Sequence, residues 1–100
     1  MSSKTKAPSA TNKGGHISQD ADPKNYARVD EATATQTGPG KAKWVVTLKD
    51  VPTKENFKKG QALTYNSKGT KNANADNSLE VTDVNGPIKY TCTGNWPMKI

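Results

Sequence analysis

The sequence predicts an all-β or nearly all-β protein, built as a small antiparallel sheet or open barrel of about four to six strands. After residue 40, apolar side chains recur with period two, the spacing that puts alternate side chains on one face of a strand. The dipeptide Asn85-Gly86, typical of a tight hairpin turn, separates two such runs. Residues 1–40 lack this pattern. We therefore expect a polar, largely disordered N-terminal arm over residues 1–40 and a small β-rich domain over residues 41–100.

The expected arm is poor in apolar side chains. Ile17 is the one strong aliphatic residue in the first 25 after Met1, so this stretch offers too little apolar surface to offset its ordering entropy. Residues 26–37 give conflicting signals: Tyr26 and Val29 have helical spacing, whereas the following Thr/Ala alternation fits a strand. Strand, helix and neither all remain open for this stretch. Gly38-Pro39-Gly40 predicts the domain boundary.

Within the expected domain, strands are predicted over residues 43–49, 61–66, 79–84, 88–93 and 96–100. Residues 53–60 fit either one helical turn or a loop with Phe57 as an apolar plug, and residues 67–78 fit a long surface loop. The side chains expected to face inward are Trp44, Val46, Leu48, Phe57, Leu63, Tyr65, Leu79, Val81, Ile88, Tyr90, Cys92, Trp96, Met98 and Ile100.

The net charge of +6 belongs almost entirely to the expected domain. Residues 1–40 carry five cationic and four acidic side chains (5 − 4 = +1), and residues 41–100 carry ten lysines and five acidic side chains (10 − 5 = +5). Such a surface could meet phosphates, and it gives the candidate macromolecule-binding residues Lys43, Lys49, Lys68, Lys71 and Lys89. Arginine is absent after residue 28, so sequence-specific base reading is disfavoured. The aromatic side chains of the expected domain are predicted to lie in the core, which disfavours base stacking.

Residue types that carry catalysis are scarce. His16 is the only histidine and lies in the expected arm, while Cys92 is the only cysteine and falls in the inward phase of its strand. The chain can therefore form neither a histidine-based triad nor an intrachain disulfide or multi-cysteine zinc site. No pair of carboxylates falls on one inward strand face, as acid–base catalysis would need. We expect no enzyme activity, no catalytic residues, no metal and no cofactor.

One metal-binding pattern can be weighed against a plain loop. Residues 72–83 repeat the oxygen-ligand spacing of a calcium-binding EF-hand loop, with Asn72 first and Asp83 twelfth. The first ligand is normally Asp, the sixth position normally Gly and the twelfth normally Glu, whereas this chain has Asn72, Asn77 and Asp83 there. The flanking segments also read as strands instead of helices, so the prediction is a polar loop.

These observations favour a non-enzymatic binding or structural module that interacts with another macromolecule, with a protein as the expected partner. The alternative is a non-specific single-stranded nucleic-acid-binding protein that uses its lysine-rich surface. No apolar run approaches the roughly 18 residues of a membrane span, and the first residues lack the apolar stretch of a signal peptide. We therefore expect no membrane association, and either a cytoplasmic location or release by a route without a cleaved signal.

Overall fold

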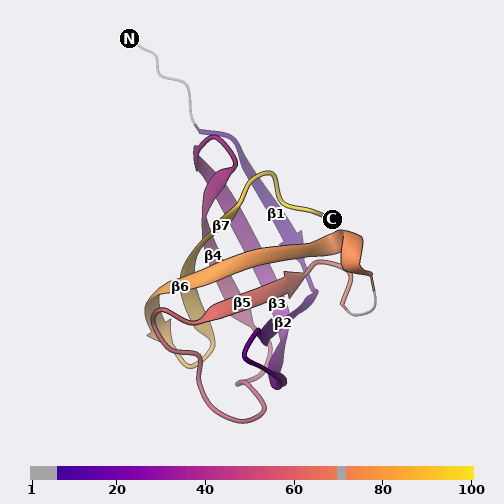
Figure 1. Ribbon diagram of the computed structural model, residues 1–100, viewed down its shortest axis with the longest axis vertical. Helices are drawn as coiled ribbons and strands as arrows, with labels where there is room; N and C mark the ends of the chain where they lie inside the picture. Colours follow the sequence, from indigo (N-terminus) through magenta and orange to yellow (C-terminus); the bar gives the residue numbers. More distant parts are fainter. Residues whose placement is uncertain (1–6, 70–71) are drawn as a thin grey trace.

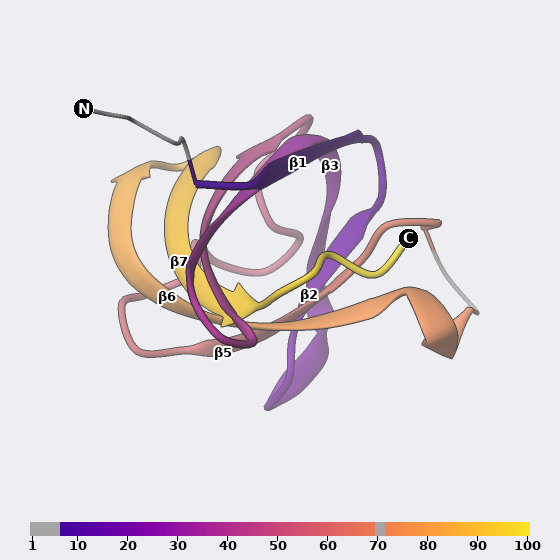
Figure 2. The same cartoon turned by 90° about the horizontal axis from the view of Figure 1, so that it is seen from above.

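The computed structural model describes residues 7–69 and 72–100 as one antiparallel sheet that curls into a ring (Figures 1 and 2). Its seven strands are β1 (Ser9–Lys13), β2 (His16–Gln19), β3 (Asp22–Gly38), β4 (Lys41–Leu48), β5 (Ala62–Asn66), β6 (Asp76–Gly86) and β7 (Lys89–Asn95). A single 3-10 turn, η1 (Ala73–Ala75), precedes β6. The predicted all-β, antiparallel class is confirmed, with more strands than expected.

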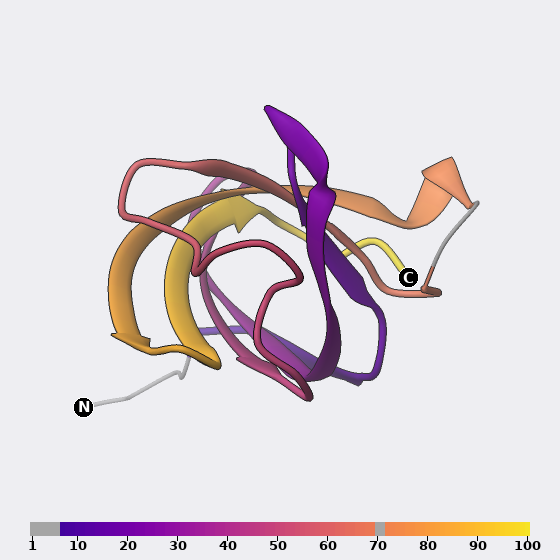
Figure 3. The same ribbon diagram turned by 90° about the horizontal axis from the view of Figure 1, so that it is seen from below.

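The ring is made of two antiparallel meanders. In the first meander, β1 and β2 lie end to end along one side of the long strand β3, and β4 pairs with its other side. The second meander is β5–β6–β7. Pairing of β4 with β7 and of β2 with β5 joins the two meanders and closes most of the ring. Figure 3 shows the loop between β4 and β5 at the lower end of this ring.

The predicted division into a disordered arm and a domain is wrong for residues 9–38, which form three strands of the sheet. The inward side chains of β2 and β3 are fully part of the core: Ile17, Ala27, Val29, Ala32 and Ala34 are each exposed by 2% or less. Most of them are too small to give a hydropathy signal, yet their backbone pairs along the whole length of β3. The segment predicted as a boundary, residues 38–40, is instead the tight connection between β3 and β4.

Small residues on several strands make room for large ones inside the ring. Trp44 is fully buried, and the residues opposite it on the neighbouring strands are Ala34 and Cys92. Gly94 serves the same purpose, because a Cβ there would collide with the side chain of Leu79 and with the backbone oxygen of Ser78. The interior of a narrow barrel commonly alternates large and small side chains in this way.

Most of the predicted core is confirmed. Trp44, Val46, Leu48, Phe57, Leu63, Tyr65, Leu79, Val81, Tyr90, Cys92 and Met98 are buried, and Trp96 is partly buried against the core. Ile88 and Ile100 were predicted inward, but they are 41% and 60% exposed.

The hairpin of β6 and β7 is confirmed, but its turn is displaced. Gly86 pairs with Lys89, so Pro87 and Ile88 form the turn, and Ile88 is exposed for that reason. The predicted C-terminal strand is wrong, because β7 ends at Asn95 and residues 97–100 form no strand. Met98 is buried nevertheless, and side-chain bonds to the C-terminal backbone take the place of strand pairing.

Two buried asparagines hold the irregular segments. Asn77 Nδ2 donates to the carbonyl of Lys99 at 3.0 Å, and its Oδ1 accepts from the N–H of Lys99 at 2.7 Å. Asn25 Oδ1 accepts from the N–H groups of Lys54 and Glu55 at 3.0 and 3.2 Å. The hydrogen bonds of Asn25 fix the loop over residues 53–60, which forms no helical turn. Because a buried amide must be hydrogen-bonded, each asparagine specifies the path of the chain around it.

Among residues 7–69 and 72–100, there is no helix of the length and apolar character needed to cross a membrane.

Candidate interaction surfaces

Cys92, the only thiol of the chain, is buried inside the ring. Cys92 is 1% exposed and lies opposite Trp44 on β4. Burial raises the pKa of the Cys92 thiol from its ordinary value of 9.0 to about 12, because the thiolate would lose its hydration there. The thiol therefore stays protonated at neutral pH, and solvent does not reach it.

His16 lies on the outside of β2, in contrast to Cys92. Its ring stacks on Tyr26 of β3, with 4.8 Å between ring centroids and 29° between planes. Partial burial lowers the pKa of His16 from 6.5, since the charged imidazolium is disfavoured there. His16 is thus neutral at pH 7, and it lines a hollow on the outer surface over β2 and β5.

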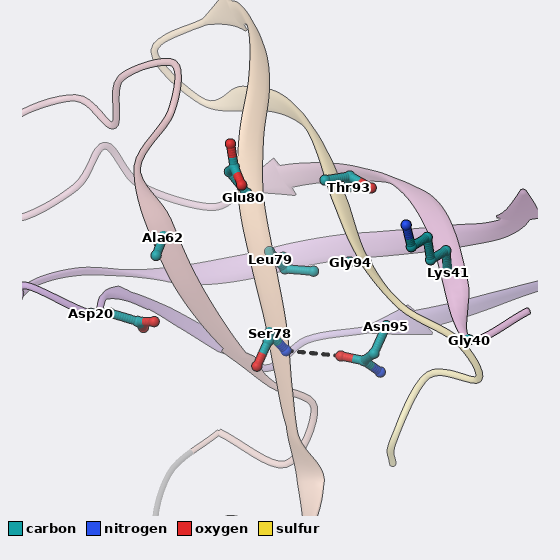
Figure 4. Close-up of a pocket in the computed structure, with 10 residues that line it drawn as sticks. All are labelled: Asp20, Gly40, Lys41, Ala62, Ser78, Leu79, Glu80, Thr93, Gly94 and Asn95. Carbon is teal, nitrogen blue, oxygen red and sulfur yellow. Dashed lines mark hydrogen bonds between the residues drawn. The ribbon is translucent and has the colours of Figure 1, made fainter. Parts of the chain in front are cut away.

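Two hollows lie side by side on the outer surface. The first hollow, of about 440 Å³, crosses β5, β6 and β7 and is shown in Figure 4. Glu80, Thr93 and Lys41 bring their side chains to it, and Asp20 lies at its margin (Figure 4). Two of its lining residues are hydrogen-bonded to each other: the N–H of Ser78 donates to Asn95 Oδ1 at 2.8 Å.

The second hollow, of about 380 Å³, lies over β2 and β5 and has Asp20 in common with the first. His16, Ser18, Asn66 and Asp76 are among its lining residues. Asp20 is fixed by a 2.6 Å hydrogen bond from the hydroxyl of Thr64, and Asp76 accepts from Asn66 Nδ2 at 2.6 Å. Neither carboxylate takes part in an ion pair within the described part of the chain.

The predicted lysine set does not converge on one site. Lys43 and Lys89 share the outer face of the adjacent strands β4 and β7, where their strand partners are Thr93 and Thr47. Lys49 follows the end of β4, and Lys68 lies in the turn after β5. Lys71 lies outside the described residues. Only the pair on β4 and β7 therefore forms a shared basic surface.

The segment with EF-hand-like spacing has no loop geometry that would gather its oxygens. Asn72 Oδ1 accepts from the N–H of Asn74, Asp76 is bonded to Asn66, and Asn77 is buried. The last eight positions, residues 76–83, lie along β6, where alternate side chains point to opposite faces. In the described ranges no three histidine, cysteine, aspartate or glutamate side chains come close enough to hold a metal.

The hollows were not predicted from the sequence. Their lining residues come from β2, β5, β6 and β7, and part of that set lies in the stretch read as a disordered arm. The signal that could have indicated β2 is weak: Ile17 stands alone between polar residues, and a single apolar position defines no period.

Comparison with known proteins adds no relative: no protein-family model, no curated protein and no solved structure matches the chain.

Proposed function

We propose that the protein is a non-enzymatic binding module that engages a protein partner on the outer surface of its barrel, across the two adjoining hollows. The observation that carries the proposal is the contrast between a filled interior and a hollowed exterior. The largest side chains, Trp44, Phe57, Tyr65 and Tyr90, are buried in the ring, and so a ligand would bind outside it.

The surface of the hollows supports contact with an extended partner. The two hollows share Asp20 and together cross β2, β5, β6 and β7. Their side chains are hydroxyls, amides and carboxylates, several of them held in place by hydrogen bonds within the sheet. Prepositioned polar groups lose little entropy on binding, which favours specific recognition.

Capture of partners from the native source, with two charge-reversal variants, tests this proposal. Glu80→Lys places a lysine in the first hollow, and Lys89→Glu reverses one charge on the basic surface of β4 and β7; both positions are exposed, and Lys89 lines neither hollow. We expect the specific partner to be lost with Glu80→Lys and retained with Lys89→Glu, by quantitative mass spectrometry of the captured proteins. Loss with Lys89→Glu alone would contradict the assignment to the hollows.

The alternative, single-stranded nucleic acid on the lysine surface, rests on Lys43 and Lys89 lying on one face. Burial of Trp44 and Tyr90 argues against it, since neither ring is available to stack on a base. A fluorescence anisotropy titration with oligothymidylate should give a Kd weaker than about 100 μM at physiological salt, the range of non-specific attraction. Micromolar, steeply salt-dependent binding that weakens with Lys89→Ala would favour the alternative.

A further inference from the structure

We propose that the free edge of β1 accepts an extended segment of the partner protein as an additional strand, and that this segment continues over the second hollow. The inference rests on the proposed function and names the mode of binding. β1 is the one strand of the described chain that pairs along one side only over its whole length, with β3. In Figure 1 it lies along the upper part of the ring, beside the long strand β3.

The hydrogen-bond register shows which groups of β1 face the open side. The N–H of Gln36 donates to the carbonyl of Pro8, and the N–H of Gly14 donates to the carbonyl of Asp30, both at 2.9 Å. These pairs belong to the same register as Ala10 with Ala34. Since hydrogen-bonded pairs alternate along an antiparallel ladder, the backbone of residues 8, 10, 12 and 14 points toward β3.

The backbone N–H and C=O groups of Ser9, Thr11 and Lys13 therefore point away from β3, toward the open side. Their side chains are exposed, and the close approach of the Thr11 and Thr33 hydroxyls, at 2.9 Å, is typical of a non-hydrogen-bonded pair. The edge thus presents three donors and three acceptors at the spacing that one extended peptide matches.

A second partly open edge of the sheet is protected, unlike β1. β5 pairs with β6 only as far as Glu80, so the end of β6 beyond it has no strand on that side. That end is distorted by register shifts between Val81 and Asp83 and between Val84 and Gly86. Bulges of this kind keep edges from pairing with other chains. The register of β1 with β3 contains no shift, which leaves this edge straight.

The topology also determines where an added strand would go next. β2 continues in the direction of β1 but is already paired with β5, so an added strand must leave the sheet near His16. The surface there is the second hollow, with the carboxylates of Asp20 and Asp76. The fitting partner is therefore an extended segment with a lysine or arginine a few residues beyond its paired part.

The probe is a synthetic peptide of five alternating threonine and valine residues, flanked on each side by glycine and then lysine, acetylated and amidated. Because lysine stands at both ends, either strand direction can reach the hollow. We expect saturable NMR shifts of the Ser9, Thr11 and Lys13 amides, with slower hydrogen exchange at the same three positions. Binding should weaken at least about tenfold when the five central peptide nitrogens are methylated, and also when glutamate replaces both lysines.

Two variants of the full chain complete the test. Thr11→Pro removes the N–H that faces the open side and leaves every backbone hydrogen bond to β3, so the protein should fold while its peptide affinity falls at least about tenfold. Thr11→Val removes the same hydroxyl contact with Thr33 but keeps the N–H, and should bind like the natural chain. Ala10→Pro removes a bond to β3 and should lower the thermal midpoint, which verifies the register independently of any ligand.

Equal affinity of Thr11→Pro and Thr11→Val would overturn the edge assignment, and so would shifts confined to the hollow or no saturable shift at all. Protection of the three amides that grows with protein concentration alone would show a second copy on the edge, and would overturn the assignment to a different protein. None of these results decides the proposed function, because partner capture with Glu80→Lys and Lys89→Glu tests the hollows separately.

Discussion

The long strand β3 of the first meander and the strands of the second meander all bury their inward side chains, but these side chains differ in size. On β3 the inward residues that follow Asn25 are Ala27, Val29, Ala32 and Ala34, whereas the corresponding strands of the second meander carry Leu79, Val81 and Tyr90. β3 packs in the core because its small inward side chains leave room for the large side chains on the neighbouring strands. Burial therefore depends on both strands of a pair, and the strand with the small side chains has low hydropathy when its sequence is considered alone.

Filling the space beside Trp44 tests this comparison with the largest expected effect. Ala34→Leu adds three carbon atoms where Ala34, fully buried, faces Trp44. We expect the free energy of unfolding to fall by about 1–3 kcal/mol or more, the usual cost of overpacking. Urea denaturation followed by tryptophan fluorescence measures it.

Ala21→Leu is the matched control, because Ala21 is exposed in the turn between β2 and β3. It should change stability by no more than about 0.5 kcal/mol. If Ala34→Leu were equally harmless, β3 would not pack against Trp44 in the core.

A smaller effect is expected where the two meanders are joined by side chains. The hydroxyl of Tyr65, on β5, donates to the carbonyl of Gly14 at 2.6 Å and accepts from Asn12 Nδ2 at 2.7 Å. Tyr65→Phe removes the side-chain donor to the Gly14 carbonyl and leaves Asn12 Nδ2 with its longer bond to the carbonyl of Ser67, at 3.2 Å. We expect the free energy of unfolding to fall by about 1–2 kcal/mol, measured by thermal or chemical unfolding.

A double-mutant cycle sharpens the interpretation of that loss. Combining Tyr65→Phe with Asn12→Ala should cost less than the sum of the two single changes, because they share a hydrogen bond. Strict additivity would mean that the Asn12–Tyr65 contact contributes nothing to holding the meanders together.

The sequence predicts the second meander better than the first for physical reasons. Leu63, Tyr65, Val81 and Tyr90 carry enough apolar surface for period two to be visible, so their strands and inward phase follow from the sequence alone. In residues 27–34 the inward positions are Ala27 and Val29 and then Ala32 and Ala34, so a register shift between Val29 and Glu31 interrupts the period. Three of the four are alanine, which is depleted in strands on average. The pairing of β3 with β1, β2 and β4 is what makes this segment a strand.

The interaction surfaces could be predicted even less. Exposure of the basic side chains follows from charge, but which lysines share a face depends on the pairing of β4 with β7, which are distant in the sequence. The hollows depend on the β2–β5 contact in the same way. The free edge of β1 depends on where β5 ends, at Asn66, and no local pattern of residues encodes that relation.

The last and smallest expected effect is a change in the free energy of unfolding at alkaline pH, and it should come from the second meander alone. No buried side chain of β1–β4 titrates, whereas the second meander buries Cys92, Tyr65 and Tyr90. Desolvation raises the pKa of all three, that of Cys92 to about 12.

A raised thiol pKa means that the folded protein holds the Cys92 proton more tightly than the unfolded chain does. Its contribution to stability is complete below the ordinary thiol pKa of 9.0 and is lost progressively as pH rises from there toward 12. The free energy of unfolding should therefore decline above pH 9, and Cys92→Ala, although less stable at neutral pH, should decline less steeply. Urea midpoints measured from pH 8 to pH 10.5 compare the two slopes, with Ala34→Leu as a control that lowers stability without removing a titrating group. Parallel slopes for the natural chain and Cys92→Ala would show that the buried thiol does not contribute to the alkaline response, and would assign that response to Tyr65 and Tyr90.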